Sequence, residues 1–184
     1  MHQYLEKTDA ELVHLALQNK EAFLYLMRRY EKQLLAFIRR ISGWNNADAE
    51  DILQEAFLKV YLNLNDYDAS LRFSSWIYRI TRNEVISKWR KLRVRPVVFL
   101  DGNEWERFSE ELFDKEKIIF EESKEKISET FQKMDEKYRE VLILKFVEEK
   151  DYKEISDILR CPMGTVATLI NRAKKQFKKI YSNI

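Results

Sequence analysis

The sequence predicts an all-α protein, and three observations lead to this fold class. The 184 residues include only three glycines and two prolines, too few for the many turns of a β-sandwich or a β-barrel. The same shortage excludes the glycine-rich phosphate loops of Rossmann and P-loop proteins. Apolar residues recur at helical spacing along most of the chain, and a hydrophobic content of 45% is sufficient for a packed core.

Three helices are expected in the first part of the chain. The first covers residues 21–41, and its apolar stripe consists of Phe23, Met27, Tyr30, Leu34, Phe37 and Ile41. Gly43 ends this helix and Asn46 caps the second one, which covers residues 47–64. Its apolar face contains Leu53, Phe57, Val60 and Leu64. A polar turn over residues 63–75 leads to a third helix over about residues 76–91, before Pro96.

An acidic linker is expected to separate two small helical domains, which cover residues 1–95 and 123–184. The linker, residues 96–122, has poor periodicity, but part of it should dock or form a short helix because it contains Phe113, Ile118, Ile119 and Phe120. Three or four more helices follow, over residues 125–134, 136–146, 152–159 and 165–181.

The last two of these helices form a helix-turn-helix pattern. Asp151 and Glu154 have the spacing of a capping box, and the first helix should bury Tyr152, Ile155, Ile158 and Leu159. Pro162 and Gly164 mark the turn, where we expect the glycine to adopt the positive φ of the chain reversal. The second helix, from Thr165, buries Val166, Ile170, Ala173 and Phe177 and leaves a polar face for the DNA major groove. A plain helical hairpin without DNA contact is the alternative.

Positive charge is concentrated in two segments although the net charge is only +2. Residues 72–95 contain eight basic side chains and one acidic side chain, Glu84, and residues 160–184 contain six basic side chains and no acid. Clustered positive charge is the electrostatic footprint of a nucleic-acid-binding protein. Two solvated helix faces are the alternative that charge alone leaves open.

Three carboxylates gather near the start of the second helix. Asp48, Asp51 and Glu55 lie at i, i+3 and i+7 and therefore share one helix face. Such a group can hold Mg²⁺ for phosphoryl transfer, but no other acid or histidine stands at a ligand-like spacing on another element. With one cysteine and two histidines, the sequence predicts no metal site, and we expect no cofactor. A partner-binding face or a solvated helix start is the preferred interpretation.

Aromatic residues alternate with arginines beside the polar turn. Tyr67, Phe73, Trp76 and Tyr78 stand among Arg72, Arg79 and Arg82. Some of these rings belong in the core. Aromatic residues interleaved with arginines beside a polar loop are also typical of proteins that hold the unstacked bases of single-stranded nucleic acid.

Two ordered sets of motifs resemble a known family. Residues 48–57, DAEDILQEAF, and residues 72–80, RFSSWIYRI, followed by Asn83, resemble the region-two signature of extracytoplasmic-function (ECF) sigma factors. Residues 162–166, PMGTV, followed by residues 171–173, NRA, are similar to the region-four helix-turn-helix of that family. Residues 136–141, EKYREV, resemble the helix before it. The resemblance covers about residues 20–177 and implies a region-two helical bundle linked to a region-four helix-turn-helix domain.

The resemblance also implies a function and the residues that perform it. It implies a transcription initiation factor, not an enzyme, that joins core RNA polymerase and directs it to promoter DNA. The clamp helices of the largest polymerase subunit would contact Asp48, Asp51, Gln54 and Glu55. The downstream promoter element, opened and with one base flipped, would contact Asn63, Tyr67, Arg72, Phe73, Trp76, Arg79, Arg82, Asn83, Lys88 and Arg90. The upstream element would contact Thr165, Thr168, Asn171, Arg172, Lys174 and Lys175.

One departure from the family pattern concerns the upstream element. Members of the family usually carry Gly-Thr-Val-Lys-Ser-Arg at the start of the recognition helix, whereas this chain has Ala167, Thr168 and Leu169 after Val166. Two cations are therefore absent, and we expect weak upstream reading, helped by an additional DNA-targeting partner. An anti-sigma factor is usual in the family, but no residue here reveals one.

Two other functions compete with this interpretation. A helix-turn-helix regulator would bind duplex DNA without polymerase, and a nucleotidyl-transfer enzyme would use the acidic cluster. No segment approaches the length of a membrane-spanning helix, and the first ten residues lack the apolar stretch of a signal peptide. We therefore expect a cytoplasmic protein without a membrane partner.

Overall fold

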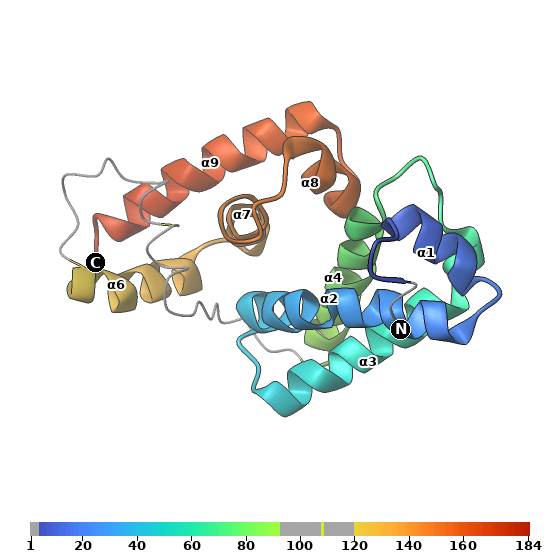
Figure 1. The fold of residues 1–184 in the computed structure, drawn as a ribbon. Helices are drawn as coiled ribbons and strands as arrows, with labels where there is room; N and C mark the ends of the chain where they lie inside the picture. Colours follow the sequence, from blue (N-terminus) through green and yellow to red (C-terminus); the bar gives the residue numbers. More distant parts are fainter. Residues whose placement is uncertain (1–3, 93–107, 109–119) are drawn as a thin grey trace. The chain divides into compact units, whose positions relative to one another are not determined.

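The computed structural model describes residues 4–92, 108 and 120–184, and within these ranges the regular secondary structure consists of helices joined by turns and loops, with no strand among them (Figure 1). The predicted all-α fold class is therefore confirmed. The chain divides into two compact units, one formed by residues 1–38 and 44–92 and the other by residues 39–43 and 93–184.

The first unit contains α1 (Asp9–Ala16), α2 (Lys20–Ser42), α3 (Asn46–Leu62), a 3₁₀ turn (Leu64–Asp66) and α4 (Phe73–Leu92). The three predicted helices are present, but their ends differ from the prediction. The second helix ends at Leu62, and the third begins at Phe73, inside the range predicted to be a turn. The cap of α3 is Asn45 rather than Asn46, because the Asn45 side chain accepts a hydrogen bond from the backbone N–H of Asp48 at 3.0 Å.

Aromatic contacts hold the three long helices of this unit together. Phe37 of α2 is fully buried, and its ring lies 4.9 Å from that of Tyr78 on α4. Phe23 of α2, which is only half-buried, meets the ring of Tyr61 on α3 at 5.0 Å. Lys59 of α3 forms a 2.6 Å ion pair with the buried carboxylate of Glu84 on α4. Glu84, the single acid of the basic segment, is therefore the partner of a lysine on the neighbouring helix.

The second unit contains α6 (Phe120–Lys133), α7 (Glu136–Leu142), a π-helical turn (Ile143–Val147), α8 (Tyr152–Leu159) and α9 (Met163–Tyr181). The predicted helix over residues 136–146 is thus an α-helix that widens into a π-helix. Helix α9, the longest described helix of this unit, packs against α6, α7 and α8. Helix α6 begins at Phe120, within the segment predicted as a linker. Phe113, Ile118 and Ile119 lie outside the described residues.

One linker residue belongs to the core of the second unit. Phe108 is fully buried, and its ring lies 4.9 Å from Phe131 of α6 and 5.2 Å from Phe177 of α9. It also meets Phe146 of the π-helical turn edge-on at 6.2 Å. Docking of the linker was expected from its apolar content, but the sequence did not single out Phe108.

Candidate nucleic-acid and partner interfaces

The helix-turn-helix begins with the predicted capping box. The Asp151 side chain accepts a hydrogen bond from the Glu154 N–H at 2.8 Å, and Glu154 accepts one from the Asp151 N–H at 3.0 Å. These reciprocal bonds satisfy two backbone donors that have no partner inside the helix. Helix α8 buries Ile155 and Ile158 as predicted, whereas Leu159 is only half-buried and the prediction for Tyr152 is wrong, because 42% of this residue is exposed.

The chain reverses at Arg160 and not at Gly164. Arg160 has a φ of 52°, and Gly164 lies inside the first turn of α9, which starts at Met163 after Pro162. Two hydrogen bonds close the turn: the Cys161 N–H donates to the Ser156 carbonyl at 3.2 Å, and the Ser156 hydroxyl donates to the Cys161 carbonyl at 2.6 Å. The expected left-handed glycine and the expected helix start at Thr165 are both wrong for this reason.

Helix α9 presents a polar face over a buried stripe. Its four predicted core residues are buried: Val166, Ile170, Ala173 and Phe177. Five of the six proposed upstream DNA contacts are exposed: Thr165, Thr168, Asn171, Arg172 and Lys175. Lys174 differs, since it is half-buried and its ammonium lies 4.7 Å from the centre of the Phe146 ring. The Thr168 hydroxyl donates to the Gly164 carbonyl of its own helix at 2.9 Å.

A loop joins the 3₁₀ turn to α4 and is shaped by its own hydrogen bonds. The Tyr67 hydroxyl donates to the Leu71 carbonyl at 2.5 Å, and the Asp68 carboxylate accepts from the Ser70 N–H at 2.9 Å. The bond from Ser70 also lowers the pKa of Asp68 below its ordinary value. At the start of this region, the Asn63 side chain donates to the Lys59 carbonyl at 2.7 Å. The loop therefore has a defined shape between two helices.

An aromatic cluster joins this loop to the start of α4. Tyr67 lies 5.5 Å from Phe73 and 5.3 Å from Trp76, measured between ring centres, and Phe73 and Trp76 are 5.7 Å apart. Phe73 and Trp76 are only 3% and 5% exposed, so their rings pack within the cluster and are not presented to solvent. Tyr67 is half-buried and is the member of the three that reaches the surface.

Helix α4 separates its predicted DNA contacts onto two sides. At 100° per residue, Arg79, Arg82, Asn83 and Arg90 follow one side of the helix. Asn83 and Arg90 are exposed, and Arg79 and Arg82 are half-buried. Lys88 is on the opposite side, where its ammonium lies 5.4 Å from the centre of the Trp44 ring.

A groove between α3 and α4 contains Lys88. It has a volume of about 550 Å³ and is lined by Glu55, Leu58, Lys59, Leu62, Glu84, Ser87, Lys88 and Lys91. Leu58 and Leu62 are 59% and 66% exposed. Lys88 therefore belongs to this groove and does not lie with Arg79 and Arg90.

The acidic residues of α3 lie on its accessible surface. Asp51, Gln54 and Glu55 are exposed, and Asp48, in the first turn, is half-buried. A carboxylate in the first turn, such as that of Asp48, interacts favourably with the helix dipole. Among the described residues, no group of three histidine, cysteine, aspartate or glutamate side chains is arranged to hold a metal ion. The acidic face is thus suited to a charged or polar partner.

Comparison with known proteins identifies the family to which this arrangement belongs. Residues 26–95 match the family model of Sigma-70 region 2, and residues 124–177 match that of Sigma-70 region 4. Over 170 residues the chain is 32% identical to the ECF RNA polymerase sigma factor SigW of Bacillus subtilis (strain 168). The aligned region covers 88% of this chain and 89% of that protein. The chain belongs to the ECF sigma factors.

Solved structures share the fold of this sigma factor. The structure of CnrH in complex with the cytosolic domain of CnrY matches 95% of this chain and 97% of that chain, with a TM-score of 0.68 and 22% identity. The sigma factor RpoE of Bartonella quintana, in complex with the anti-sigma factor NepR, matches 89% and 96% with a TM-score of 0.61 and 18% identity. In the described part of this sigma factor, no helix is both long and apolar enough to span a membrane.

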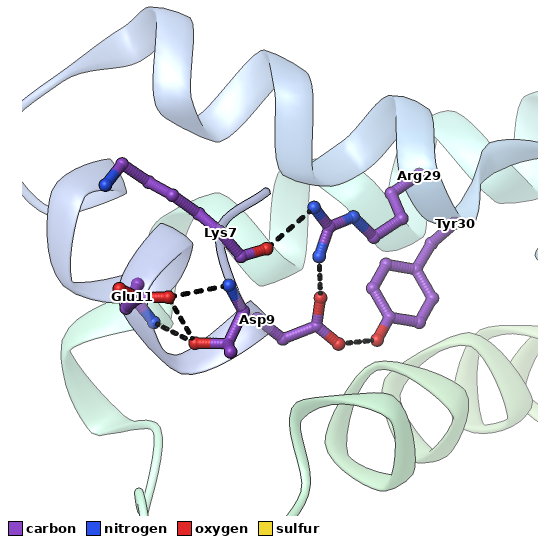
Figure 2. A network of polar contacts seen from close by, with 6 residues as sticks. Lys7, Asp9, Glu11, Arg29 and Tyr30 are labelled. Atoms are coloured by element: carbon purple, nitrogen blue, oxygen red, sulfur yellow. Dashed lines mark hydrogen bonds and ion pairs between the residues drawn. The ribbon is translucent and has the colours of Figure 1, made fainter. Parts of the chain in front are cut away.

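The sequence did not reveal a polar network at the start of this sigma factor. The network joins Asp9 of α1 to Arg29 and Tyr30 of α2 (Figure 2). Helix α1 itself was not predicted, although Thr8 and Glu11 have the spacing of a capping box and form one in the structure. That spacing is the signal that would have located the helix.

Proposed function

We propose that this ECF sigma factor binds core RNA polymerase through the acidic face of α3 and directs the polymerase to promoters through the loop, α4 and α9. The observation that carries this proposal is the match to region 2 and region 4, in that order, within one chain. As a sigma factor, the protein is a non-catalytic initiation factor, and the polymerase supplies the chemistry. An anti-sigma factor is among its expected partners.

The proposed polymerase contact consists of Asp48, Asp51, Gln54 and Glu55, which would dock on the clamp helices of the largest subunit. Exposure of the Asp51 and Glu55 carboxylates supports the assignment, because carboxylates accessible to solvent can pair with a basic partner at little desolvation cost. Such pairs contribute mainly to the association rate and to the choice of partner, so binding through this face should weaken as salt increases.

The proposed downstream DNA surface consists of the loop and one side of α4. Exposed Asn83 can reach a base edge, and the cationic side chains of Arg79, Arg82 and Arg90 can contact phosphates along the same side. Tyr67 offers a half-buried ring at the surface of the loop, whereas Phe73 and Trp76 would support the loop from below. Lys88 faces the groove beside α3 and is left out of this surface.

The proposed upstream surface is the exposed face of α9, and its sequence selectivity should be weak. Ala167 and Leu169 stand where the family pattern has cations, and both are half-buried. Arg172 and Lys175 are exposed and can position the helix on phosphates without reading bases. Promoter choice would then depend on the downstream element and on a further DNA-targeting partner.

Transcription by core polymerase from a genomic library, with and without the protein, tests the proposal by mapping start sites. New discrete starts are expected, with a sharp downstream motif and no sharp upstream motif. Asp51→Ala should weaken binding to core polymerase, because it removes one charge from the proposed contact. Glu50→Ala is the matched control, since it removes the same charge from the exposed neighbour outside the proposed contact.

Three outcomes would contradict parts of the proposal. Failure to bind core polymerase would favour a helix-turn-helix regulator that acts on duplex DNA alone. A sharp upstream motif would refute weak reading by α9. Equal effects of Asp51→Ala and Glu50→Ala would show that general charge, and not the proposed face of α3, governs the affinity for core polymerase.

A further inference from the structure

A buried tyrosine connects α1 to the aromatic cluster of Tyr67, Phe73 and Trp76 at the loop between the 3₁₀ turn and α4. Tyr30 of α2 is 6% exposed, and its hydroxyl donates a hydrogen bond to the Asp9 carboxylate (Figure 2). The other oxygen of Asp9 pairs with the Arg29 guanidinium at 2.6 Å, and Arg29 also donates to the Lys7 carbonyl at 3.0 Å. Asp9 is therefore held from both sides, and it fixes the position of the Tyr30 hydroxyl.

The ring of Tyr30 continues this connection to the loop. It meets the ring of Phe73 edge-on at 5.5 Å, and Phe73 in turn lies 5.5 Å from Tyr67. The chain of contacts therefore runs from Asp9 through Tyr30 and Phe73 to Tyr67, whose hydroxyl closes the loop on the Leu71 carbonyl at 2.5 Å. Close-packed rings transmit a small displacement, because an interior without voids offers little free space.

The protonation state of Tyr30 suits this role. Burial raises the pKa of the hydroxyl far above its ordinary value, and the hydrogen bond to Asp9 raises the pKa further. Tyr30 is therefore a permanent donor at the pH of a cell. Asp9 also contributes to the raised pKa of Tyr67, after the burial of that ring, so the Asp9 charge acts on the loop as well.

We propose that Asp9 and Tyr30 are positioning residues for recognition of the downstream promoter element. They would set the tilt of Phe73, and through it the position of Tyr67 and the loop, so that an unstacked base meets a preformed surface. The inference rests on the proposed function of the loop and α4, and it adds α1 and its network to the machinery that selects the base. The hydrogen bond from Tyr30 to Asp9 would thus contribute to discrimination between bases without any contact to DNA.

The experiment measures base discrimination by the holoenzyme formed from core polymerase and the full chain. The ligands are single-stranded DNA oligonucleotides that carry a downstream element recovered from the mapped start sites, together with the single-base variants of that element. Tyr30→Phe removes only the hydroxyl, and we expect it to reduce the affinity ratio between the element and its variants about three- to tenfold. Affinity for core polymerase should not change.

Tyr25→Phe is the matched control, because it makes the same substitution on the same helix. Among the described residues no hydrogen-bond partner faces the Tyr25 hydroxyl, and the Tyr25 ring meets Tyr4 and the Arg29 guanidinium. Asp9→Ala removes the acceptor of the same hydrogen bond that Tyr30→Phe removes at the donor. The variant that carries both substitutions should therefore discriminate between bases no worse than the poorer of the two single variants. Loss of stability alone would lower the affinity for all oligonucleotides equally and would leave the ratio unchanged.

Two results would overturn the proposal: wild-type discrimination by Tyr30→Phe, or strictly additive losses in the double variant. Asn83→Ala separates this failure from failure of the proposed DNA surface. If Asn83→Ala reduces discrimination and Tyr30→Phe does not, the positioning role is wrong and the surface on α4 stands. If only Tyr30→Phe reduces it, the positioning role stands and Asn83 must be removed from the surface.

Discussion

The docking of Phe108 leads to a quantitative prediction about the stability of the second unit. Phe108→Ala removes a fully buried ring that contacts three other rings on three elements. Substitutions of buried phenylalanine by alanine cost about 3–5 kcal/mol, and each well-placed aromatic pair accounts for about 0.5–1.5 kcal/mol beyond its buried area. Because the ring centres of Phe131 and Phe177 lie 4.9 Å and 5.2 Å from that of Phe108, we expect Phe108→Ala to lower the stability of the second unit by about 4 kcal/mol.

Native-state hydrogen exchange on the full chain is the appropriate assay, since a protein with two units does not unfold in one step. A loss of about 4 kcal/mol corresponds to a decrease of about three powers of ten in the protection of the slowest amides of α7 and α9. The slowest amides of α2 and α3 should not change, and they provide the internal control.

Phe108→Leu is the graded control, because it keeps most of the apolar bulk and loses the edge-to-face contacts. It should cost about one third as much as the alanine variant. The reasoning would be refuted if the slowest amides of α7 and α9 in Phe108→Ala were protected to within about twofold of their protection in the parent protein. Burial of the ring would then contribute nothing to the stability of the second unit.

Three further predictions concern single groups. Thr81→Val should leave the free energy of opening of α4, measured by exchange of its slowest amides, unchanged or raise it by up to about 1 kcal/mol, because the buried Thr81 hydroxyl has no hydrogen-bond partner in the described chain; a loss above about 1 kcal/mol would reveal a partner. Asp151→Ala should destabilise α8 by about 1 kcal/mol in the exchange experiment, and unchanged protection would show that the capping box is dispensable. The pKa of Tyr30 is raised above its ordinary 10.0, so its contribution to stability is complete below pH 10.0 and declines above it as the unfolded chain ionises first. Tyr30→Phe should therefore lose less stability than the parent between pH 10 and 11, and equal losses would contradict this.

Sequence patterns located the helices that bury a long apolar stripe. Helix α2 has such a stripe over 23 residues, and the capping box of Asp151 and Glu154 fixed the start of α8. Helix α1 has only eight residues with Leu12, Val13 and Ala16 buried, which is too short for periodicity to be decisive. Asp9 also joins α1 to Arg29 and Tyr30 of α2, and a contact between two helices cannot be seen in the residue pattern of one of them.

Boundaries failed where tertiary packing outweighed local preference. Polar residues before Trp76 suggested a long turn, but burial of Phe73 extends α4 to that residue. Glycine is the usual residue with positive φ, yet Arg160 adopts it because the hydrogen bonds between Ser156 and Cys161 close the turn one residue after α8. Neither outcome follows from the propensity of the residue concerned.

The candidate DNA surface could be predicted only in part, because clustered charge in the sequence does not show which cations of the basic segment lie on the same side of α4. Lys88 and Lys91 line the groove beside α3, whereas Arg79, Arg82 and Arg90 follow the other side of α4. Binding of single-stranded DNA falls with salt by a slope of about 0.7 per neutralised phosphate. Substituting Arg79 or Arg90 by alanine should therefore reduce the salt slope of holoenzyme binding to the downstream element by about 0.7 each. Lys88→Ala and Lys91→Ala should leave the slope unchanged, and an equal reduction by all four variants would mean that helix geometry does not select the DNA-facing side.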